Sequence, residues 1–331
     1  MNILAQQDIG DTAWDAFCAT SPDAWLRHTR AFMALSLTLD PHARDYSFGV
    51  MRDGALVAIV PLMCQGSEGQ REFKMGGTPV PYPALAHDVT PEERADILKV
   101  IFDEVARLAK VNEVHAATMF VDPLAASSPS LRENPLVPFG FDDTSITTTC
   151  VDLRRDEKEL LAAMAKGHRS DVHFAQKAGY AISCFDSRSF THELAQMYTK
   201  IYFAAAGKEV GAPLRWEKTF DLVRRGDAFV VFGSPANGGE YVSCAMVFAY
   251  KKSAYYAQSA LLPDARFAYR GLGHLMQWEI MQRLRQNGFE QYDIGWQEKP
   301  EDSTPKEQAI ARFKRLFGGT LLPMYRGVRT W

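Results

Sequence analysis

The sequence of 331 residues predicts an α/β protein of two similar domains, each a mixed, mostly antiparallel sheet flanked by helices. Three observations lead to this fold class. The length suits two domains of about 150 residues rather than one. The order strand, strand, helix, strand occurs once in each half of the chain. A segment rich in proline and serine, 123–138, lies between the halves, so we expect a domain of residues 1–145 and another of residues 146–331.

The first domain is expected to begin its core with a β-hairpin. Apolar runs at 46–51 and 55–63 flank a short polar turn, which is typical of two paired strands. Thr90-Pro91-Glu92-Glu93 has the pattern of a capping box with proline at the first helical position, and it predicts a helix to about residue 110. Residues 111–120 then read as a strand. The elements therefore follow in the order strand, strand, helix, strand.

The second domain repeats this order. Residues 228–233 and 241–250 predict a hairpin, and the aromatic and β-branched run 253–262 predicts a further strand. An amphipathic helix follows over 271–287, and 289–296 reads as the closing strand. No residue-level repeat links the halves, so the duplication is one of architecture.

The turn Arg270-Gly271-Leu272-Gly273 joins strand to helix in the second domain. Glycines at such a turn let backbone N–H groups approach an anion, and the helix N-terminus adds partial positive charge. A P-loop would need Gly-Lys-Ser/Thr, but Gly273 is followed by His274. A dinucleotide fingerprint would need glycine where Met276 stands. The turn is a candidate pyrophosphate cradle, and an ordinary glycine turn is the alternative.

The pattern Arg/Gln-x-x-Gly-x-Gly/Ala between a hairpin and a helix resembles the coenzyme A loop of the GCN5-related N-acetyltransferase (GNAT) superfamily. Here the match is partial, because the second glycine arrives early. Residues 152–180, 288–295 and 313–319 resemble the bridging helix and closing motifs of FemAB-like acyltransferases, which carry two GNAT-like domains. No heptad run is present, so the resemblance is to the compact branch without a coiled-coil arm. It implies tandem GNAT-like domains joined by a helix at about 156–178.

The resemblance also implies where an acyl donor binds and reacts. Arg270, Gly271, Leu272, Gly273 and His274 would hold the phosphates of an acyl-CoA, acetyl-CoA in particular, with no metal.

The family's lysine near the reacting carbonyl corresponds to Lys314, on a helix that the capping box Thr304-Pro305-Lys306-Glu307 begins. We expect Lys314 to stabilise the oxyanion. Asp293 is the candidate proton acceptor; Tyr256, Glu298 and a chain of waters are the alternatives.

Three residues are candidates for binding the acceptor. Arg169 and Lys177, on the predicted helix 156–178, suit an anionic acceptor such as a nucleotide-linked sugar, unless they only balance nearby acidic residues. Tyr82 lies in the proline-rich loop 76–83, which either lines the acceptor cleft or is an irregular connection. The first domain has no glycine turn before its helix, so we expect the donor to bind the second domain alone.

Composition narrows the class of protein. A net charge of −3 argues against DNA as a partner, and the apolar runs are shorter than the roughly 20 residues of a membrane helix. The first residues lack the pattern of a secretory signal. His168 and His173, five positions apart, do not form a helical metal pair and are expected on a solvated or substrate-facing surface. The cysteines are odd in number and widely spread, which suits the cytoplasm: Cys18, Cys64, Cys150, Cys184 and Cys244.

The resulting hypothesis is a cytoplasmic N-acyltransferase that moves an acyl group from acyl-CoA to an amine of a small or nucleotide-linked acceptor. One alternative is an aminoacyl-tRNA-dependent transferase acting on a cell-wall precursor. Residues 306–331, with six basic residues and one acidic residue, would suit tRNA as the donor carrier. Another alternative is a non-catalytic GNAT-like pair that binds a glycan or a protein.

Overall fold

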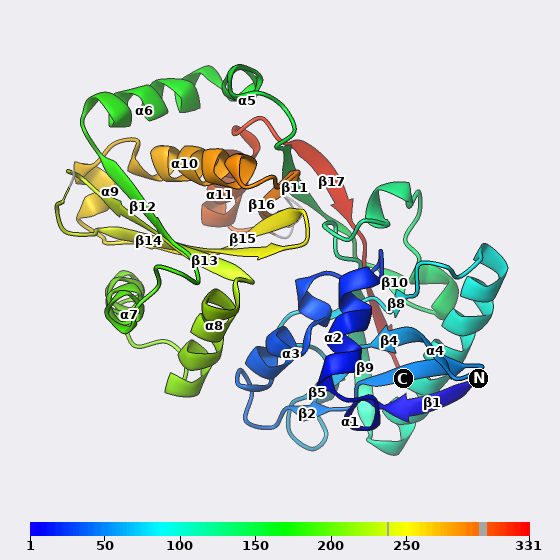
Figure 1. Cartoon of the computed structure of the whole chain (residues 1–331). Helices are drawn as coiled ribbons and strands as arrows, with labels where there is room; N and C mark the ends of the chain where they lie inside the picture. The colour runs from blue at the N-terminus through cyan, green and yellow to red at the C-terminus, as the bar shows by residue number, and fades with distance from the viewer. Residues whose placement is uncertain (237, 298–302) are drawn as a thin grey trace. The chain divides into compact units, whose positions relative to one another are not determined.

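A computed structural model describes residues 1–236, 238–297 and 303–331 (Figure 1). The chain divides into two compact units. Unit 1 contains Met1–Ile146 together with Pro323–Trp331, and unit 2 contains Thr147–Leu322. The sequence-based division placed all of residues 146–331 in the second domain, whereas the last nine residues belong to unit 1. The reason is backbone pairing, since the C-terminal strand is hydrogen-bonded inside the sheet of unit 1.

Unit 1 combines short strands with four α-helices among the described residues. Its helices are α1 (Gln6–Ile9), α2 (Asp11–Thr20), α3 (Arg30–Leu37) and α4 (Pro91–Val111), with single 3-10 turns at Leu26–His28, Ser128–Ser130 and Val137–Phe139. Its strands are β1 (Asn2–Ala5), β2 (Arg44–Asp45), β3 (Phe48–Arg52), β4 (Ala55–Val60), β5 (Met63–Gln65), β6 (Arg71–Phe73), β7 (Val80–Pro81), β8 (Ala84–Leu85), β9 (Val114–Phe120), β10 (Asp142–Asp143) and β18 (Arg326–Thr330). The predicted hairpin, helix and strand of this half are therefore present as β3–β4, α4 and β9.

The strands of unit 1 form two sheets. One has the order β1-β3-β4-β8, and the other has the order β10-β18-β9-β6-β5-β2 with β7 also on β9. Pairing is antiparallel except where β9 meets β6 and β7. The apolar side of α4 packs onto this core through Ile97, Ile101 and Val105, all fully buried. The period of these residues, four positions, is that of one helix face.

Unit 2 is built on one mixed sheet. Within the described residues its order is β12-β13-β14-β15-β16-β11-β17. Its strands are β11 (Ile146–Asp152), β12 (Ala181–Phe185), β13 (Ala228–Ser234), β14 (Ser243–Tyr250), β15 (Ser253–Leu261), β16 (Gln291–Gln297) and β17 (Thr320–Met324), the last of which runs on into unit 1. Its helices are α5 (Glu157–Ala163), α6 (Lys166–Lys177), α7 (His192–Ala206), α8 (Pro213–Arg225), α9 (Ala265–Ala268), α10 (Leu272–Gln286) and α11 (Pro305–Arg315). The predicted α/β class with mixed, mostly antiparallel sheets is confirmed.

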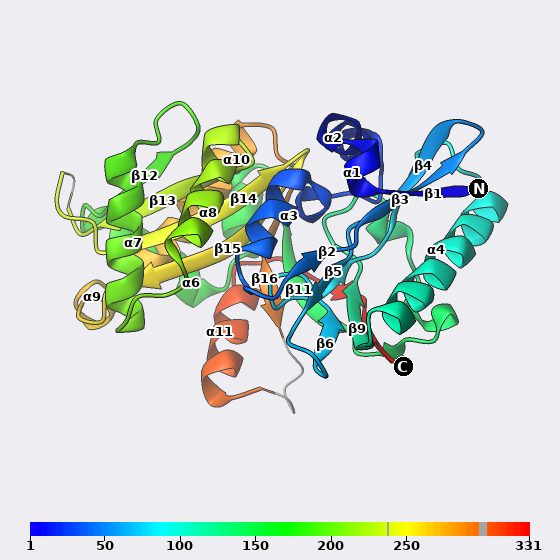
Figure 2. The ribbon, with the colours of Figure 1, turned by 90° about the horizontal axis from the view of Figure 1, so that it is seen from below.

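Helices cover both faces of this sheet. Figures 1 and 2 show α6 and α10 on one face and α7 and α8 on the other. The core under α10 is apolar because Leu275, Met276 and Ile280 pack against the small residues Ala245 and Ala254 of β14 and β15. On the opposite face Tyr198, Trp216 and Phe220 form an aromatic cluster with Phe232 of β13. α6, α7 and α8 each bury one stripe, as their amphipathic sequences predict, whereas α10 is buried over most of its surface.

The centre of the sheet opens between two strands. β15 and β16 are parallel, and their pairing covers only Ser253–Tyr255 against Gln291–Asp293 in the described chain. The register between β14 and β15 also shifts here: Val247 pairs with Tyr256 and Met246 with Gln258, which leaves Ala257 unpaired as a bulge. A bulge bends its strand and increases its twist. From Tyr256 onward β15 therefore leaves β16, and a gap opens between them.

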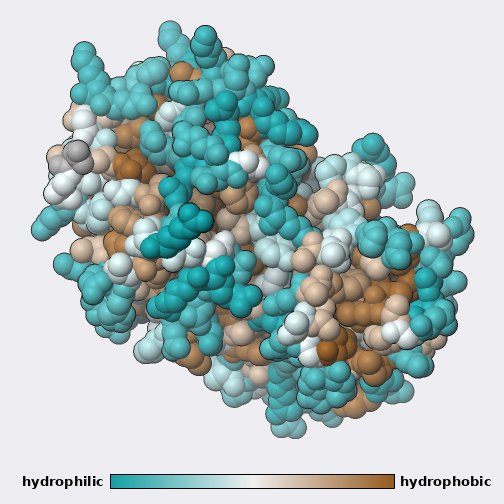
Figure 3. Space-filling view, in the orientation of Figure 1, coloured by the Kyte–Doolittle hydropathy of each residue, from teal (hydrophilic) through white to brown (hydrophobic). Residues whose placement is uncertain are grey.

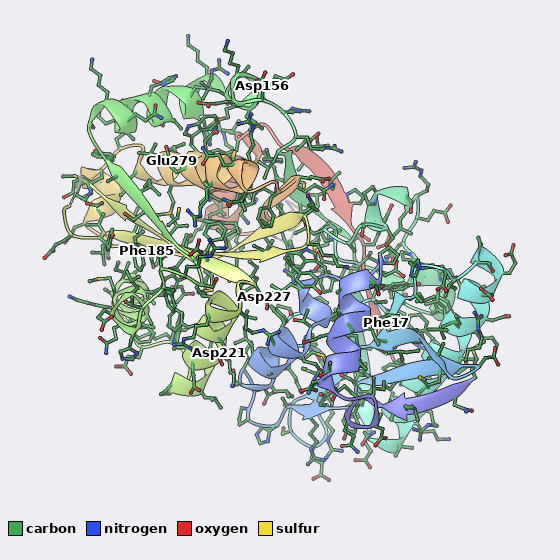
Figure 4. The ribbon with its side chains drawn as sticks, in the orientation of Figure 1. Phe17, Asp156, Phe185, Asp221, Asp227 and Glu279 are labelled. Carbon is green, nitrogen blue, oxygen red and sulfur yellow. The ribbon has the colours of Figure 1, made fainter. Side chains whose placement is uncertain are left out.

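The bridging segment differs from its prediction. Instead of one helix over 156–178, α5 and α6 are separated by Met164 and Ala165, whose backbones are extended. Asp156, labelled in Figure 4, begins α5 by accepting the Glu159 N–H at 2.8 Å. The break is stabilised from both sides: Ala165 donates its N–H to the Leu316 carbonyl at 2.9 Å, and Arg169 donates to the carbonyls of Ala162 and Met164. In Figure 3 the outer surface over α5 and α6 is mostly hydrophilic.

Candidate active site

The predicted donor turn lies at the N-terminus of α10. Gly271 is the N-cap with φ 81°, no side chain caps the helix, and the first turn holds no acidic residue. The first N–H groups of a helix have no partner within the helix, and they carry its partial positive charge. The end of α10 is therefore chemically suited to an anion.

The space around the two glycines of this turn differs, so glycine is required at one position and not at the other. A Cβ at Gly271 would lie 2.4 Å from the Asp171 carbonyl oxygen, and its positive φ also favours glycine. A Cβ at Gly273 would meet nothing within 4 Å, and Gly273 is exposed. Packing of α10 on α6 thus explains Gly271. It does not explain Gly273, which leaves open backbone next to the helix N-terminus.

Asp171 of α6 holds the side chains on both sides of the glycines. Its Oδ1 accepts from Arg270 Nε at 2.9 Å and lies 2.8 Å from Nη2, and its Oδ2 lies 3.7 Å from His274 Nε2. The Arg270 guanidinium also lies 5.1 Å from the ring centre of Phe174. Sequence reasoning named Arg270 and His274 but missed Asp171. The sequence shows that Asp171 lies within one helical turn of Arg169 and Phe174. It does not show that Asp171 pairs with Arg270, 99 positions further along the chain.

His274 belongs to a packed cluster of rings. Its ring centre lies 4.4 Å from that of His168 and 5.0 Å from that of Phe313, and Phe317 closes the group at 4.6 Å from His168. Burial, together with the neighbouring His168, lowers the pKa of His274 to about 4. This cluster connects the donor turn to α11.

His168 corrects a sequence expectation. It was expected on a solvated or substrate-facing surface, but it is 7% exposed and its Nε2 lies 3.0 Å from the Phe313 carbonyl oxygen. Burial lowers its pKa. The face of α6 that carries His168, Val172 and Ala175 packs inward, because these positions recur at the helical period. His173 lies on the exposed side, as expected.

Lys314 lies beside β16. Its Nζ donates to the Trp296 carbonyl at 3.0 Å, and it lies close to Gly295, where an added Cβ would come within 2.7 Å of Nζ. Burial lowers the pKa of the Lys314 ammonium, and the nearby Asp293 carboxylate opposes that shift. Lys314 follows Phe313, so the ring cluster anchors its helix. The structure therefore brings Lys314, Asp293 and His274 into one region of unit 2.

Asp293 is 1% exposed, and its carboxylate accepts two hydrogen bonds. Its Oδ1 accepts from the Thr148 hydroxyl and, at 2.7 Å, from the Gly295 N–H. The Thr148 bond ties β16 to β11 next to their register shift between Thr149 and Cys150, and the Gly295 bond lies within β16. The carboxylate has a clear structural function, and its role as proton acceptor stays a prediction.

Tyr256 is the first residue of β15 beyond the pairing with β16. Burial raises the pKa of its phenol, while hydrogen bonding with Ser259 and Gln277 acts in the opposite direction. The role of Tyr256 in proton transfer also stays a prediction.

The three acceptor candidates are not gathered in one place by local contacts. Arg169 donates to the carbonyls of Ala162 and Met164, and these hydrogen bonds stabilise the C-terminal end of α5. Lys177 is exposed at the end of α6. Tyr82 belongs to unit 1, where it is 6% exposed and its carbonyl lies 2.8 Å from His28 Nε2. Glu298, an alternative proton acceptor, lies outside the described residues.

No group of three or more His, Cys, Asp or Glu side chains is arranged to hold a metal ion in the described parts of the chain. In those same parts, no helix has the length and apolar character needed to cross a membrane.

Residues 174–315 match the family model described as an acetyltransferase (GNAT) domain. No curated protein matches the chain. Among solved structures, FemX is 16% identical with a TM-score of 0.70, covering 98% of this chain and 97% of its own. L-PGS from Bacillus licheniformis is 12% identical with a TM-score of 0.60, covering 97% and 92%. A tandem GNAT protein from the clavulanic acid biosynthesis pathway is 15% identical with a TM-score of 0.53, covering 88% and 84%.

The family match falls on the half of the chain that holds the uncapped α10 and Lys314, and the structural likeness extends over both units. Residues 174–315 thus match a GNAT acetyltransferase domain, and the chain as a whole has a FemAB-like tandem fold.

Proposed function

We propose that this acyltransferase moves an acyl group from acyl-CoA, acetyl-CoA in the first instance, to an amine of a small or nucleotide-linked acceptor. One observation carries the proposal: α10 begins without a cap or an acidic residue and exposes Gly273 beside its first N–H groups. Phosphates are favoured ligands for such a helix end. Arg270 supplies a guanidinium next to the turn.

The gap between β15 and β16 supports a path for the rest of the donor. α10 starts beside Gly233, where Leu272 and Met276 approach the end of β13, and β15 ends nearby because Leu261 pairs with Ser243. From Tyr256 to Leu261 β15 no longer pairs with β16 in the described chain. An unpaired strand edge offers N–H and C=O groups to an extended ligand. A donor arm running from the turn along this edge would reach Tyr256.

The chemistry then requires charge stabilisation and proton transfer. The acceptor nitrogen attacks the thioester carbonyl, and negative charge develops on oxygen. In this proposal the Lys314 ammonium stabilises that oxygen, with Asp293 favouring its charged form. Asp293 and Tyr256 are the candidates for moving the proton of the attacking amine. A cytoplasmic location is part of the proposal, because the five cysteines are free thiols and such thiols persist in reducing compartments.

Isothermal titration of the whole chain with acetyl-CoA, longer acyl-CoA and free CoA tests the donor. We expect saturable heat with CoA compounds and, once donor binding is established, turnover in a screen of amine acceptors. An absence of heat with every CoA compound contradicts the acyl-CoA proposal.

Aminoacyl transfer is the second candidate, because the fold likeness to FemX and L-PGS favours it. The basic residues 306–331 support it less than their sequence suggests. Arg326 and Arg329 belong to unit 1, where they already donate to the carbonyls of Thr144 and Phe139. Titration with aminoacylated tRNA beside acetyl-CoA separates the two donors. Turnover with either donor excludes a non-catalytic binding protein.

A further inference from the structure

An exposed aromatic ring lies on α6 beside the donor turn. Phe174 is 44% exposed, on a surface that is otherwise mostly hydrophilic (Figure 3). The inward side of α6 is formed by His168, Val172 and Ala175, so core packing does not account for this ring. A single exposed apolar side chain is ordinary on a protein surface. Phe174 differs from the ordinary case because a guanidinium lies over it.

That guanidinium belongs to Arg270, and α6 restricts its orientation. Its central carbon lies 5.1 Å from the ring centre of Phe174. Asp171, one helical turn before Phe174, accepts from Arg270 Nε at 2.9 Å, and the same oxygen lies 2.8 Å from Nη2. A guanidinium is planar, so a carboxylate along one edge and a ring beside one face together hold the plane. The Arg270 side chain is nevertheless 63% exposed, which leaves much of that plane open to solvent.

This arrangement suits a flat neutral ring better than a phosphate. The Asp171 carboxylate balances the charge of Arg270 and would repel a phosphate placed beside the pair. Stacking on a guanidinium or on an aromatic ring needs no net charge, and every nucleobase offers a face for it. The ring of Phe174 and the plane of Arg270 therefore have the chemistry of a nucleobase platform.

The platform lies next to the helix end that is proposed to hold the donor phosphates. A Cβ on Gly271 would lie 2.4 Å from the Asp171 carbonyl oxygen and 3.3 Å from the Ala175 Cβ, so α6 passes directly beside the start of α10. Lys177 is exposed and follows Phe174 by three positions, which places both on the same side of α6. Its distance from Asp171 along the helix is about 9 Å, six residues at 1.5 Å each. A single nucleotide could reach all these groups.

We propose that Phe174 and Arg270 form the nucleobase subsite of the donor: the adenine of coenzyme A stacks on them, and Lys177 pairs with the 3′-phosphate of its ribose. The inference rests on the proposed acyl-CoA donor and makes the donor more specific, because the subsite selects the complete nucleotide over phosphopantetheine alone. Asp171 is a positioning residue, since it acts through Arg270. Lys177, a candidate for the acceptor on sequence grounds, binds the donor instead.

Calorimetric titration of the whole chain with three compounds separates the parts of the donor. Free CoA carries every part, 3′-dephospho-CoA lacks the 3′-phosphate, and 4′-phosphopantetheine lacks the nucleotide. Phe174→Ala should weaken the binding of CoA and of 3′-dephospho-CoA about tenfold, as the loss of base stacking on a ring does, and leave 4′-phosphopantetheine unchanged. Lys177→Gln should weaken CoA alone. Equal affinity of wild type and Phe174→Ala for CoA overturns the proposal.

Matched variants separate stacking from damage to the turn. Leu214→Ala is the control, because Leu214 is 50% exposed on α8, which covers the opposite face of the sheet (Figure 1), and it should leave all three affinities unchanged. Arg270→Lys keeps the charge but loses the plane, so it should weaken CoA more than 4′-phosphopantetheine. Phe174→Trp keeps a ring at the position and should bind CoA at least as well as the wild type. An equal loss of CoA and 4′-phosphopantetheine binding in Phe174→Ala means that the ring only supports the turn, and it overturns the proposal.

Adenosine 3′,5′-bisphosphate tests the subsite without the acyl arm. We expect it to bind the wild type and to bind Phe174→Ala and Lys177→Gln more weakly. If it does so while no acyl-CoA is turned over with any amine, the proposed transfer fails and the nucleobase subsite stands. If acyl-CoA is turned over while the bisphosphate binds wild type and Phe174→Ala equally, the transfer stands and the subsite is overturned. An absence of heat with the bisphosphate and with every CoA compound overturns both.

Discussion

Units 1 and 2 each place a helix before a strand that pairs in parallel, but the two helices begin in opposite ways. α4 precedes β9, which is parallel to β6 and β7, and α10 precedes β16, which is parallel to β15. At the start of α4 the Thr90 hydroxyl accepts the Glu93 N–H, and the Glu93 carboxylate accepts the Thr90 N–H at 2.9 Å. At the start of α10 there is a bare glycine.

The difference shows that the layout alone does not make a donor site. The capping box of α4 satisfies its first N–H groups and adds two acidic residues, Glu92 and Glu93, where a phosphate would have to sit. The first turn of α10 has neither a side-chain cap nor an acidic residue of its own, and the nearby Asp171 of α6 is paired with Arg270. The comparison therefore favours unit 2 as the proposed donor-binding unit, and each prediction below tests one part of this proposal.

The largest effect is expected at the open glycine. Gly273→Val should abolish acyl-CoA binding, because its branched side chain would fill the space beside the helix N-terminus that the pyrophosphate needs. Since a Cβ at this position meets nothing within 4 Å, the fold should be kept. Titration calorimetry measures binding, and a thermal melt checks the fold. Unchanged donor affinity in a folded variant would show that this helix end is not the donor site.

Lys314→Ala should come next, with a loss in kcat of about 10²–10³ and a smaller effect on donor affinity. The ammonium matters most where negative charge develops, and its removal costs about 3–4 kcal/mol of transition-state stabilisation. Lys306→Ala is the control, because Lys306 is exposed on the same helix. Steady-state kinetics and donor titration are compared for the three proteins. Full activity of the Lys314 variant would show that the family resemblance assigned this lysine wrongly.

Acid should weaken unit 2 through the ring cluster at the donor turn. The folded pKa of His274 is about 4, and the unfolded value is near 6.5. Below about pH 6.5 the unfolded chain therefore binds a proton that the folded unit does not. Stability falls as pH drops from about 6.5 to 4, by up to about 3 kcal/mol from this residue.

Denaturant unfolding at steps between pH 6.5 and 4 measures this loss. His274→Gln should flatten the pH dependence, and His173→Gln, a change on the exposed side of α6, should leave it intact. An equal slope in wild type and His274→Gln would mean that His274 does not stay neutral in the folded unit. NMR titration of the His274 ring would then give its pKa directly.

Local signals predicted the fold well and the site only in part. The capping boxes at Thr90 and Thr304 start helices where predicted, because both partners of the box lie within four residues of each other. The division between the units was predicted less well, since the sequence around β18 does not reveal that it pairs with β9, two hundred residues away.

The residues that sequence reasoning missed near the candidate site also interact with partners that are distant in the sequence. Asp171 meets Arg270, and Gln277 meets Tyr292, only after the sheet has formed. A glycine turn and a lysine after phenylalanine can be recognised as short motifs. A buried glutamine in an amphipathic helix cannot, because the hydrophobic period hides it.

The smallest effect is expected from a change at the capped helix of unit 1, α4. Thr90→Ala removes the side-chain oxygen that caps α4 and should cost about 1 kcal/mol of stability, as N-cap losses typically do. It should not change acyl-CoA affinity at all, because Glu92 and Glu93 still place negative charge at that helix end. Denaturant unfolding and donor titration are run on the same samples, with wild type as the reference. A weaker donor affinity in this variant would mean that unit 1 contributes to donor binding, and the assignment of the donor to the bare glycine end of α10 alone would be wrong.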